Sequence, residues 1–198
     1  MIGSLPREGG PGRGWLFATL FFSSLPLAAQ TLPEQIALCE ACHGKGGNSE
    51  IAGTPSIAAQ PPTFLENQLV YFREGLRNAP VMQGVAKGMK DPDITALAKH
   101  FSEQKARVVV AAPADKALTA RGSELAAKMH CGECHLPKYQ GRAQMPRIAG
   151  QREEYMVDTM IAYRDNKRTG ADTTMSEVLY GMSDADIRAL AHYLSRLE

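Results

Sequence analysis

Residues 39–43 read Cys-Glu-Ala-Cys-His, and residues 131–135 read Cys-Gly-Glu-Cys-His. This Cys-x-x-Cys-His pattern is the attachment signature of c-type heme. Two thiols at this spacing can each add to one vinyl group of the same porphyrin, and the histidine that follows then lies beneath the iron as its proximal ligand. The sequence therefore predicts two heme c groups, covalently attached. Their predicted protein ligands are Cys39, Cys42 and His43 in the first motif, and Cys131, Cys134 and His135 in the second.

Other chemistries of paired cysteines explain less of the pattern. These are all four cysteines of the chain, so they could form a four-cysteine zinc site. A zinc site would leave both adjacent histidines unexplained. A thioredoxin-like motif needs one Cys-x-x-Cys pair in a βαβ context. An oxidising compartment would also permit disulfides within or between the pairs.

The first 29 residues have the features of a secretory signal peptide. Arg7 and Arg13 precede an apolar run over residues 15–27, and small residues follow it. A basic start, a short apolar run and small residues at its end are typical of such signals. The run is too short to span a membrane comfortably. We predict cleavage after Ala29 and a periplasmic protein; an uncleaved anchor is the alternative.

The composition excludes some classes of function. The chain has 198 residues, a hydrophobic content of 44% and a formal net charge of +1. That hydrophobic content is ordinary for a globular protein. Neither half is basic enough to indicate nucleic-acid binding.

The second half of the chain repeats the first. The equivalent residues lie 91 to 93 positions apart: Cys39 and Cys131, Pro55 and Pro146, Gln60 and Gln151, Phe72 and Tyr163, Arg77 and Arg168, Met82 and Met175, Leu97 and Leu190. We therefore predict two domains of one type, over residues 30–103 and 116–198. Residues 104–115 show no helical periodicity and would form an extended linker between them.

Helical patterns dominate both copies. The first predicted helix begins near Thr31, where Glu34 completes a capping box, and its counterpart covers residues 115–130. Apolar side chains on one face predict middle helices over residues 64–72 and 155–163. Apolar residues at i, i+3, i+4 and i+7 predict last helices that contain Ile94, Leu97, Ala98 and Phe101, and Ile187, Leu190, Ala191 and Leu194. No strand pattern is evident outside the linker, so the predicted fold is all-α.

Each predicted heme needs a ligand on its other face. The methionines at suitable spacing are Met82 and Met89 in the first copy, and Met175 and Met182 in the second. Ser183 is a good N-cap, which places Met182 and Ile187 as a hydrophobic staple. Met89 occupies the equivalent place in the first copy. Since Met89 and Met182 already have a structural role, we favour Met82 and Met175 and expect both in loops.

Histidines are the alternative ligands: His100, His130 and His192. A lone histidine on a helix is more often packed or solvated. His/Met ligation raises the heme potential relative to two histidines and fills the sixth position of the iron. It therefore favours electron transfer over catalysis at iron.

A proximal histidine also needs an acceptor for its other ring nitrogen. The carbonyl groups of Pro55 and Pro146 are candidates, since each proline follows its heme motif by 11 or 12 residues. The alternative is that both are ordinary turn prolines.

Together these motifs resemble the diheme cytochromes c of the c4 type over about residues 30–198. The shared features are the paired heme motifs and the pattern Pro-x-[Ile/Leu]-Ala-x-Gln. Each copy also has an aromatic residue followed by arginines that end at Arg77 or Arg168, and a methionine eight residues before Lys90 or Ser183. The resemblance implies two class I cytochrome c domains related by a pseudo-twofold axis, with the heme propionate edges facing each other. It implies Met82 and Met175 as iron ligands and electron transfer towards a terminal oxidase.

The two copies differ near their predicted hemes. Ala59 stands opposite Gly150, Lys90 opposite Ser183, and His100 opposite Tyr193. Such differences in polarity and packing predict two unequal heme potentials.

We predict a periplasmic electron carrier and not an enzyme. It would pass electrons from respiratory donors to a terminal oxidase and associate with membranes only through these redox partner proteins. The alternative is a cytochrome subunit of a periplasmic dehydrogenase complex. A diheme enzyme, such as a peroxidase or a thiosulfate-oxidising cytochrome, would need an open or unusual sixth position.

Overall fold

The computed structural model describes residues 1, 3, 30–110, 112–168 and 173–198. The predicted signal peptide lies outside the described residues except for Met1 and Gly3. In the described part, the only β contact is an isolated bridge between Arg142 and Met145. The all-α prediction is therefore confirmed. No helix among these residues has the length and apolar character needed to cross a membrane.

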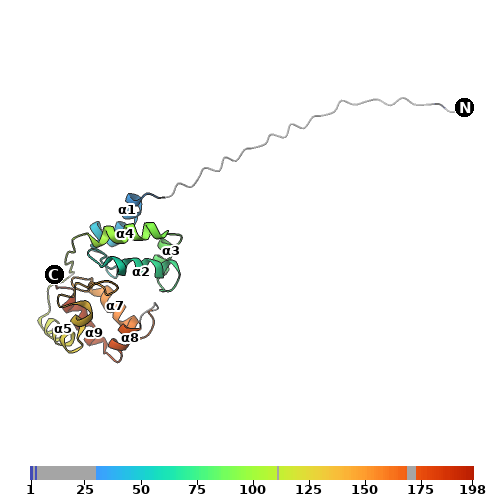
Figure 1. The fold of residues 1–198 in the computed structure, drawn as a ribbon. Coiled ribbons are helices and arrows are strands. Elements are labelled where there is room, and N and C mark those ends of the chain that lie inside the picture. Colours follow the sequence, from blue (N-terminus) through green and yellow to red (C-terminus); the bar gives the residue numbers. More distant parts are fainter. Residues whose placement is uncertain (2, 4–29, 111, 169–172) are drawn as a thin grey trace.

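The helices form two groups that follow one another along the chain (Figure 1). The first group contains α1 (Leu32–His43), the 3-10 turn η1 (Lys45–Gly47), α2 (Pro62–Arg73), α3 (Pro80–Ala86) and α4 (Asp91–Ser102). The second contains α5 (Lys116–Lys128), α6 (Cys131–His135), α7 (Glu153–Arg164), α8 (Thr174–Leu179) and α9 (Asp184–Leu194). In each group the last helix packs against the first and middle helices: α4 on α1 and α2, and α9 on α5 and α7. The two halves thus repeat one arrangement.

The first helix of each domain begins as predicted but ends differently. The backbone N–H of Thr31 donates to Oε2 of Glu34 at 2.7 Å, which forms the predicted capping box of α1. α1 then continues through the first heme motif to its histidine. In the second copy the chain adopts a left-handed conformation at His130 (φ 56°), which separates α5 from α6. The helix predicted over about residues 115–130 is therefore confirmed as α5, which ends two residues earlier, at Lys128.

The last helix is the largest contributor to each of the two cores. All eight apolar residues predicted from their periodicity are buried. In the first domain Leu97, Ala98 and Phe101 cluster with Leu65 of α2, and in the second all four cluster with Leu125 of α5 and Met156 of α7. α5 and α9 cross closely at Gly122, where a Cβ atom would lie 2.1 Å from the carbonyl oxygen of Ala189. Only a residue without a side chain permits this crossing.

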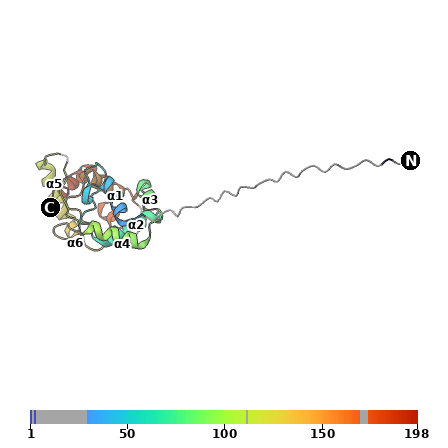
Figure 2. The ribbon, with the colours of Figure 1, turned by 90° about the horizontal axis from the view of Figure 1, so that it is seen from above.

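The segment between the two groups contacts both of them. Residues 105–110 form no helix. The side chain of Asn48 accepts from the Arg107 N–H at 2.7 Å and donates to the Lys105 carbonyl at 3.1 Å, which attaches the segment to the first domain. Arg152 donates to the Val109 carbonyl at 2.9 Å, which attaches it to the second. The two groups lie one above the other in Figure 1, and in the view from above the first group covers much of the second (Figure 2).

Candidate heme sites

Both Cys-x-x-Cys-His motifs lie on helices, which brings each cysteine pair one helical turn apart. Cys39 and Cys42 are in the last part of α1, and Cys131 and Cys134 lie in α6. All four are free thiols. The outer cysteines, Cys42 and Cys134, are exposed. Cys39 is partly buried, and this burial raises the pKa of its thiol to about 11. Each motif therefore presents two unpaired sulfurs on neighbouring positions of one helix face.

The histidine of each motif has a fixed proton position. Nδ1 of His43 lies 2.8 Å from the carbonyl oxygen of Pro55, and Nδ1 of His135 lies 2.8 Å from that of Pro146. A carbonyl oxygen can only accept, so Nδ1 carries the proton and Nε2 keeps its lone pair. Metal-bound histidines in proteins typically have this arrangement.

Burial also favours the form of these histidines that binds metal. His43 and His135 are only 8% and 6% exposed. Burial lowers the pKa of both imidazoles, although the hydrogen bonds to the proline carbonyls act in the opposite direction. A neutral imidazole with a free Nε2 is the state that an axial heme ligand requires. The residues of both sites therefore fit the heme that their motifs predict.

The favoured methionines lie in short helices, so the expectation that they lie in loops is wrong. Met82 is in α3, which begins at Pro80, and Met175 is in α8. Both side chains are partly buried. Met82 is not part of the first core cluster, whereas Met89 packs against it. In the second domain both Met175 and Met182 pack against the core.

The structural role predicted for the other two methionines is supported. The carbonyl groups of Met89 and Met182 accept from Nη1 of Arg73 and Arg164, each at 3.0 Å. The hydroxyl of Ser183 accepts from the Asp186 N–H at 3.1 Å, as predicted for the N-cap of α9. Lys90, the counterpart of Ser183, makes no such bond. Sequence patterns did not predict the two arginine anchors, although both arginines are visible in the repeat.

The histidine alternatives are engaged elsewhere. Nε2 of His192 accepts from the Asp115 N–H at 2.9 Å, and its Nδ1 lies 3.2 Å from Oε1 of Glu153. Both nitrogens are therefore occupied. His130 is exposed and pairs with Glu133 at 3.1 Å. His100 packs edge-on against Phe101. A zinc site also lacks support, because no three His, Cys, Asp or Glu side chains converge on a metal-sized site in the described residues.

Two arginines from different domains meet at one tyrosine. Nη2 of Arg77 lies 3.2 Å and Nη1 of Arg168 lies 3.4 Å from the hydroxyl of Tyr155. Burial raises the pKa of Tyr155, but the positive charges of Arg168 and Arg77 outweigh it and lower this pKa to about 7. Among the described residues, the groups that shift the pKa of Arg77 and Arg168 include no carboxylate. Heme propionates are carboxylates, so this excess of positive charge also fits heme.

Comparison with known proteins identifies the family. The family profile for cytochrome c matches residues 119–198. The thiosulfate dehydrogenase electron acceptor of Thiomonas intermedia (strain K12) is 34% identical over 88% of this chain and 85% of its own length. Cytochrome c4 of Pseudomonas aeruginosa is 31% identical over 81% of this chain and 84% of its own. The chain belongs to the cytochrome c4 family.

Solved structures agree with this assignment. The crystal structure of reduced recombinant cytochrome c4 from Pseudomonas stutzeri covers 86% of this chain and is itself covered completely, with a TM-score of 0.76 and 30% identity. Thiosulfate dehydrogenase (TsdBA) from Marichromatium purpuratum contains a similar region. The match covers 81% of this chain and 36% of that one, with a TM-score of 0.70 and 26% identity. As a c4-type cytochrome, the protein has two tandem domains with two heme c sites of His/Met type. It carries electrons and is not catalytic.

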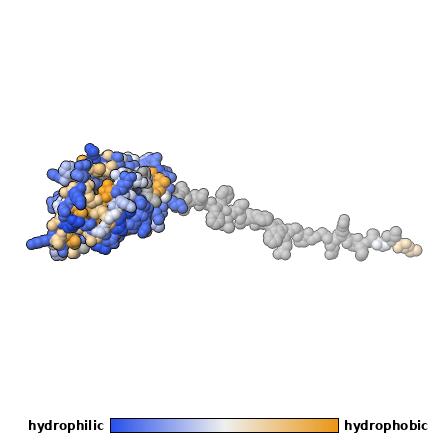
Figure 3. Space-filling view, turned by 90° about the horizontal axis from the view of Figure 1, so that it is seen from below, coloured by the Kyte–Doolittle hydropathy of each residue, from blue (hydrophilic) through white to orange (hydrophobic). Residues whose placement is uncertain are grey.

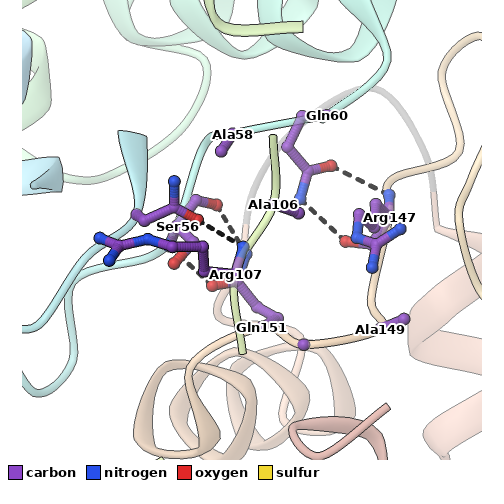
Figure 4. Close-up of a pocket in the computed structure, with 10 residues that line it drawn as sticks. Ser56, Ala58, Gln60, Ala106, Arg107, Arg147, Ala149 and Gln151 are labelled. Carbon is purple, nitrogen blue, oxygen red and sulfur yellow. Dashed lines mark hydrogen bonds between the residues drawn. The ribbon is translucent and has the colours of Figure 1, made fainter. Parts of the chain in front are cut away.

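The interface of this c4-type pair contains two glutamines that sequence patterns left without a role. Gln60 of the first domain reaches the backbone of Arg147, and Gln151 of the second reaches the backbone of Ser56 (Figure 4). The two glutamines are equivalent in the repeat, and so are their two partners. Their repetition was visible in the sequence, but their partners in the other domain were not.

Proposed function

We propose that this protein is a periplasmic electron carrier with two hemes c, one attached to each Cys-x-x-Cys-His motif. His43 with Met82 and His135 with Met175 would be the axial ligand pairs. The observation that carries this proposal is the hydrogen bond from each Nδ1 to a proline carbonyl, at 2.8 Å in both domains, since it leaves both Nε2 atoms available. Bound heme supplies a one-electron couple, and methionine sulfur would complete its coordination.

The proposed chain organisation follows the repeat. Residues 1–29 would be the export signal, residues 30–103 and 116–198 the two heme domains, and residues 104–115 the linker. Polar contacts of the linker with both domains support this division, because they hold the domains together without a helix between them.

Apolar residues near the proposed methionine ligands support two docking regions for redox partners. Leu76 before α3 and Val81 within it are 52% and 76% exposed, and Val178 and Tyr180 are 39% and 81% exposed in and after α8. The face in Figure 3 shows apolar residues in separate groups on a largely polar surface. Small apolar contacts within a polar surface suit partners that bind briefly and leave. One region would meet the electron donor and the other the acceptor.

The relatives support a dehydrogenase as the donor. The Thiomonas relative is named for accepting electrons from thiosulfate dehydrogenase. We propose that this protein accepts electrons from a comparable periplasmic dehydrogenase and delivers them towards a terminal oxidase. The similarity to part of the TsdBA chain favours a second candidate function, which is that of a permanent subunit of such a dehydrogenase.

An electron-transfer assay with purified holoprotein distinguishes the two functions. Thiosulfate dehydrogenase and thiosulfate would be mixed with an excess of the protein, and heme reduction would be followed by absorbance. A carrier should be reduced by two electrons per chain over many turnovers and elute separately from the enzyme in size-exclusion chromatography. Co-elution at a fixed ratio would favour the subunit, and no reduction would contradict this donor class.

A further inference from the structure

A pair of glutamines crosses the domain interface in a reciprocal manner. Oε1 of Gln151 accepts from the Ser56 N–H at 2.7 Å, and its Nε2 donates to the Ser56 carbonyl at 2.8 Å. Oε1 of Gln60 accepts from the Arg147 N–H at 2.9 Å, and its Nε2 donates to the Arg147 carbonyl at 2.8 Å. Each side chain thus satisfies both backbone groups of one residue in the other domain (Figure 4).

Both glutamines are shielded from water. Gln60 is 4% exposed and Gln151 is 6% exposed. In an environment of low polarity, hydrogen bonds are electrostatically stronger and bonds in a chain polarise one another. The four bonds are therefore in a place where their effect on neighbouring groups is large.

The backbone groups that these glutamines bind belong to the histidine sites. The Ser56 N–H and the Pro55 carbonyl are the two ends of one peptide group. That carbonyl accepts from Nδ1 of His43 at 2.8 Å. A continuous chain of hydrogen bonds thus runs from His43, through the Pro55–Ser56 peptide group, to Gln151 of the second domain.

The second domain contains the equivalent arrangement. The Pro146 carbonyl accepts from Nδ1 of His135 at 2.8 Å, and the N–H of the same peptide group donates to Gln60 of the first domain. A peptide group whose N–H donates to a good acceptor gains negative charge on its oxygen. The oxygen then accepts more strongly from the histidine, and the imidazole becomes a more basic ligand.

We propose that each domain tunes the heme of the other through this crossed relay, with Gln151 acting on His43 and Gln60 acting on His135. The two glutamines are positioning residues, since they act on the iron only through the peptide group and the histidine. The inference rests on the proposed assignment of His43 and His135 as axial ligands. A more basic imidazole stabilises ferric iron, so an intact relay lowers the potential of the heme across the interface.

The decisive variant is Gln60→Met, which keeps a similar volume and removes the acceptor. The heme of the second domain should rise in potential, while the heme on the variant's own domain should not. Gln151→Met should raise the potential of the first heme in the same way. It also removes an acceptor from the Arg152 N–H, at 2.9 Å, so Gln60→Met is the cleaner change.

Two controls separate the relay from a loosened interface. Gln60→Glu keeps an oxygen that accepts from the Arg147 N–H, so it should not raise the potential of the second heme. Asn48→Leu removes another buried side chain, one that holds the linker through Lys105 and Arg107 and whose hydrogen bonds do not go to the residues of either relay. It should leave the difference between the two potentials unchanged.

The measurement is a redox titration of the full-length holoprotein, followed by absorbance and by NMR of ¹⁵N-labelled histidine. The Nδ1 signals of His43 and His135 report which iron is reduced at each step and how strongly each Nδ1–H is bonded. A rise confined to the heme opposite each variant, with a weakened Nδ1–H bond at its histidine, would support the proposal. A shift in the variant's own heme, equal shifts in both hemes, or no shift would overturn it.

Failure of the relay would not be confused with failure of the proposed function. The wild-type titration tests for two His/Met hemes without any variant. If that spectrum lacked methionine ligation, the proposed ligand set would fail, while the histidine signals would still report on the relay. Either glutamine variant alone suffices if the other does not assemble.

Discussion

The proximal histidines and the candidate methionines differ in how well the structure defines them at the scale of single residues. A carbonyl 2.8 Å from each Nδ1 fixes the tautomer of both histidines. The heme motifs alone predicted these two residues, because covalent attachment demands a strict spacing. The choice of methionine depended instead on helix-cap chemistry, which the structure supports through the Ser183 cap and the anchored Met182 carbonyl.

Substitution of Met175 by histidine tests that choice. The weak near-infrared band of ferric heme with methionine ligation should lose half of its intensity, and one potential should fall, because histidine lowers the heme potential relative to methionine. Near-infrared absorption of the ferric protein measures the band. The control is Met182→Leu, which should leave the band intact. If Met182→Leu removed the band and Met175→His did not, the ligand assignment would be wrong.

Ala59 has a left-handed backbone (φ 53°), as does its counterpart Gly150 (φ 66°). This conformation costs a residue with a side chain about 1–2 kcal/mol. Glycine avoids that cost but loses about 0.5–1 kcal/mol more than alanine in conformational entropy on folding. Ala59→Gly should therefore stabilise the protein by up to about 1 kcal/mol. Denaturant unfolding of the holoprotein gives the free energy.

Gly150→Ala is the matched control for that change. A Cβ atom at this position would be strained and would lie 3.1 Å from the carbonyl oxygen of Leu197. The substitution should destabilise the protein. Opposite results for the two variants would show that the backbone conformation at these equivalent positions does not matter.

Helices with a strong apolar periodicity were predicted from the sequence, whereas short helices and the break between α5 and α6 were not. α4 and α9 were predicted from four apolar positions each, since their packed faces are long. α3 and α8 were missed because they have seven and six residues, too few for a periodic signal. The break at His130 has no glycine or proline to mark it, so it depends on tertiary contacts that the local sequence does not show.

The close crossing of α5 and α9 leaves no room for a side chain at Gly122. Gly122→Ala should separate the two helices, because the new Cβ atom would lie 2.1 Å from the Ala189 carbonyl. Overpacking of this kind costs about 1–3 kcal/mol, and the thermal unfolding temperature should fall. Gly84→Ala in α3 is the control. Its Cβ atom would meet nothing within 4 Å, so it should leave stability unchanged or raise it by up to about 1 kcal/mol.

Over the whole molecule, the repeat predicted two similar domains but not how they face each other. Offsets of 91 to 93 residues identify equivalent positions and contain no information about contacts between the copies. The crossed glutamines and the tyrosine held by Arg77 and Arg168 were therefore not predicted. Both arise from the facing of the domains.

Differences between the two halves predict unequal heme potentials. His100 packs on Phe101 with ring centroids 4.9 Å apart, whereas its counterpart Tyr193 contacts Tyr139 at 6.3 Å. Potentiometric titration should give two Nernst waves, and His100→Tyr should shift only one of them, since packing and polarity near a heme set its potential. A single wave that the substitution does not change would remove the reason for assigning the two hemes different roles.

The redox-titrated absorption spectrum of the purified holoprotein tests the central claim most directly, because it reports heme count and methionine ligation together. We predict two reversible one-electron hemes per chain, each with the near-infrared methionine band when ferric and with no binding of added cyanide at low concentration. One heme per chain, or a ferric heme that lacks the band and takes up the added ligand, would contradict the account.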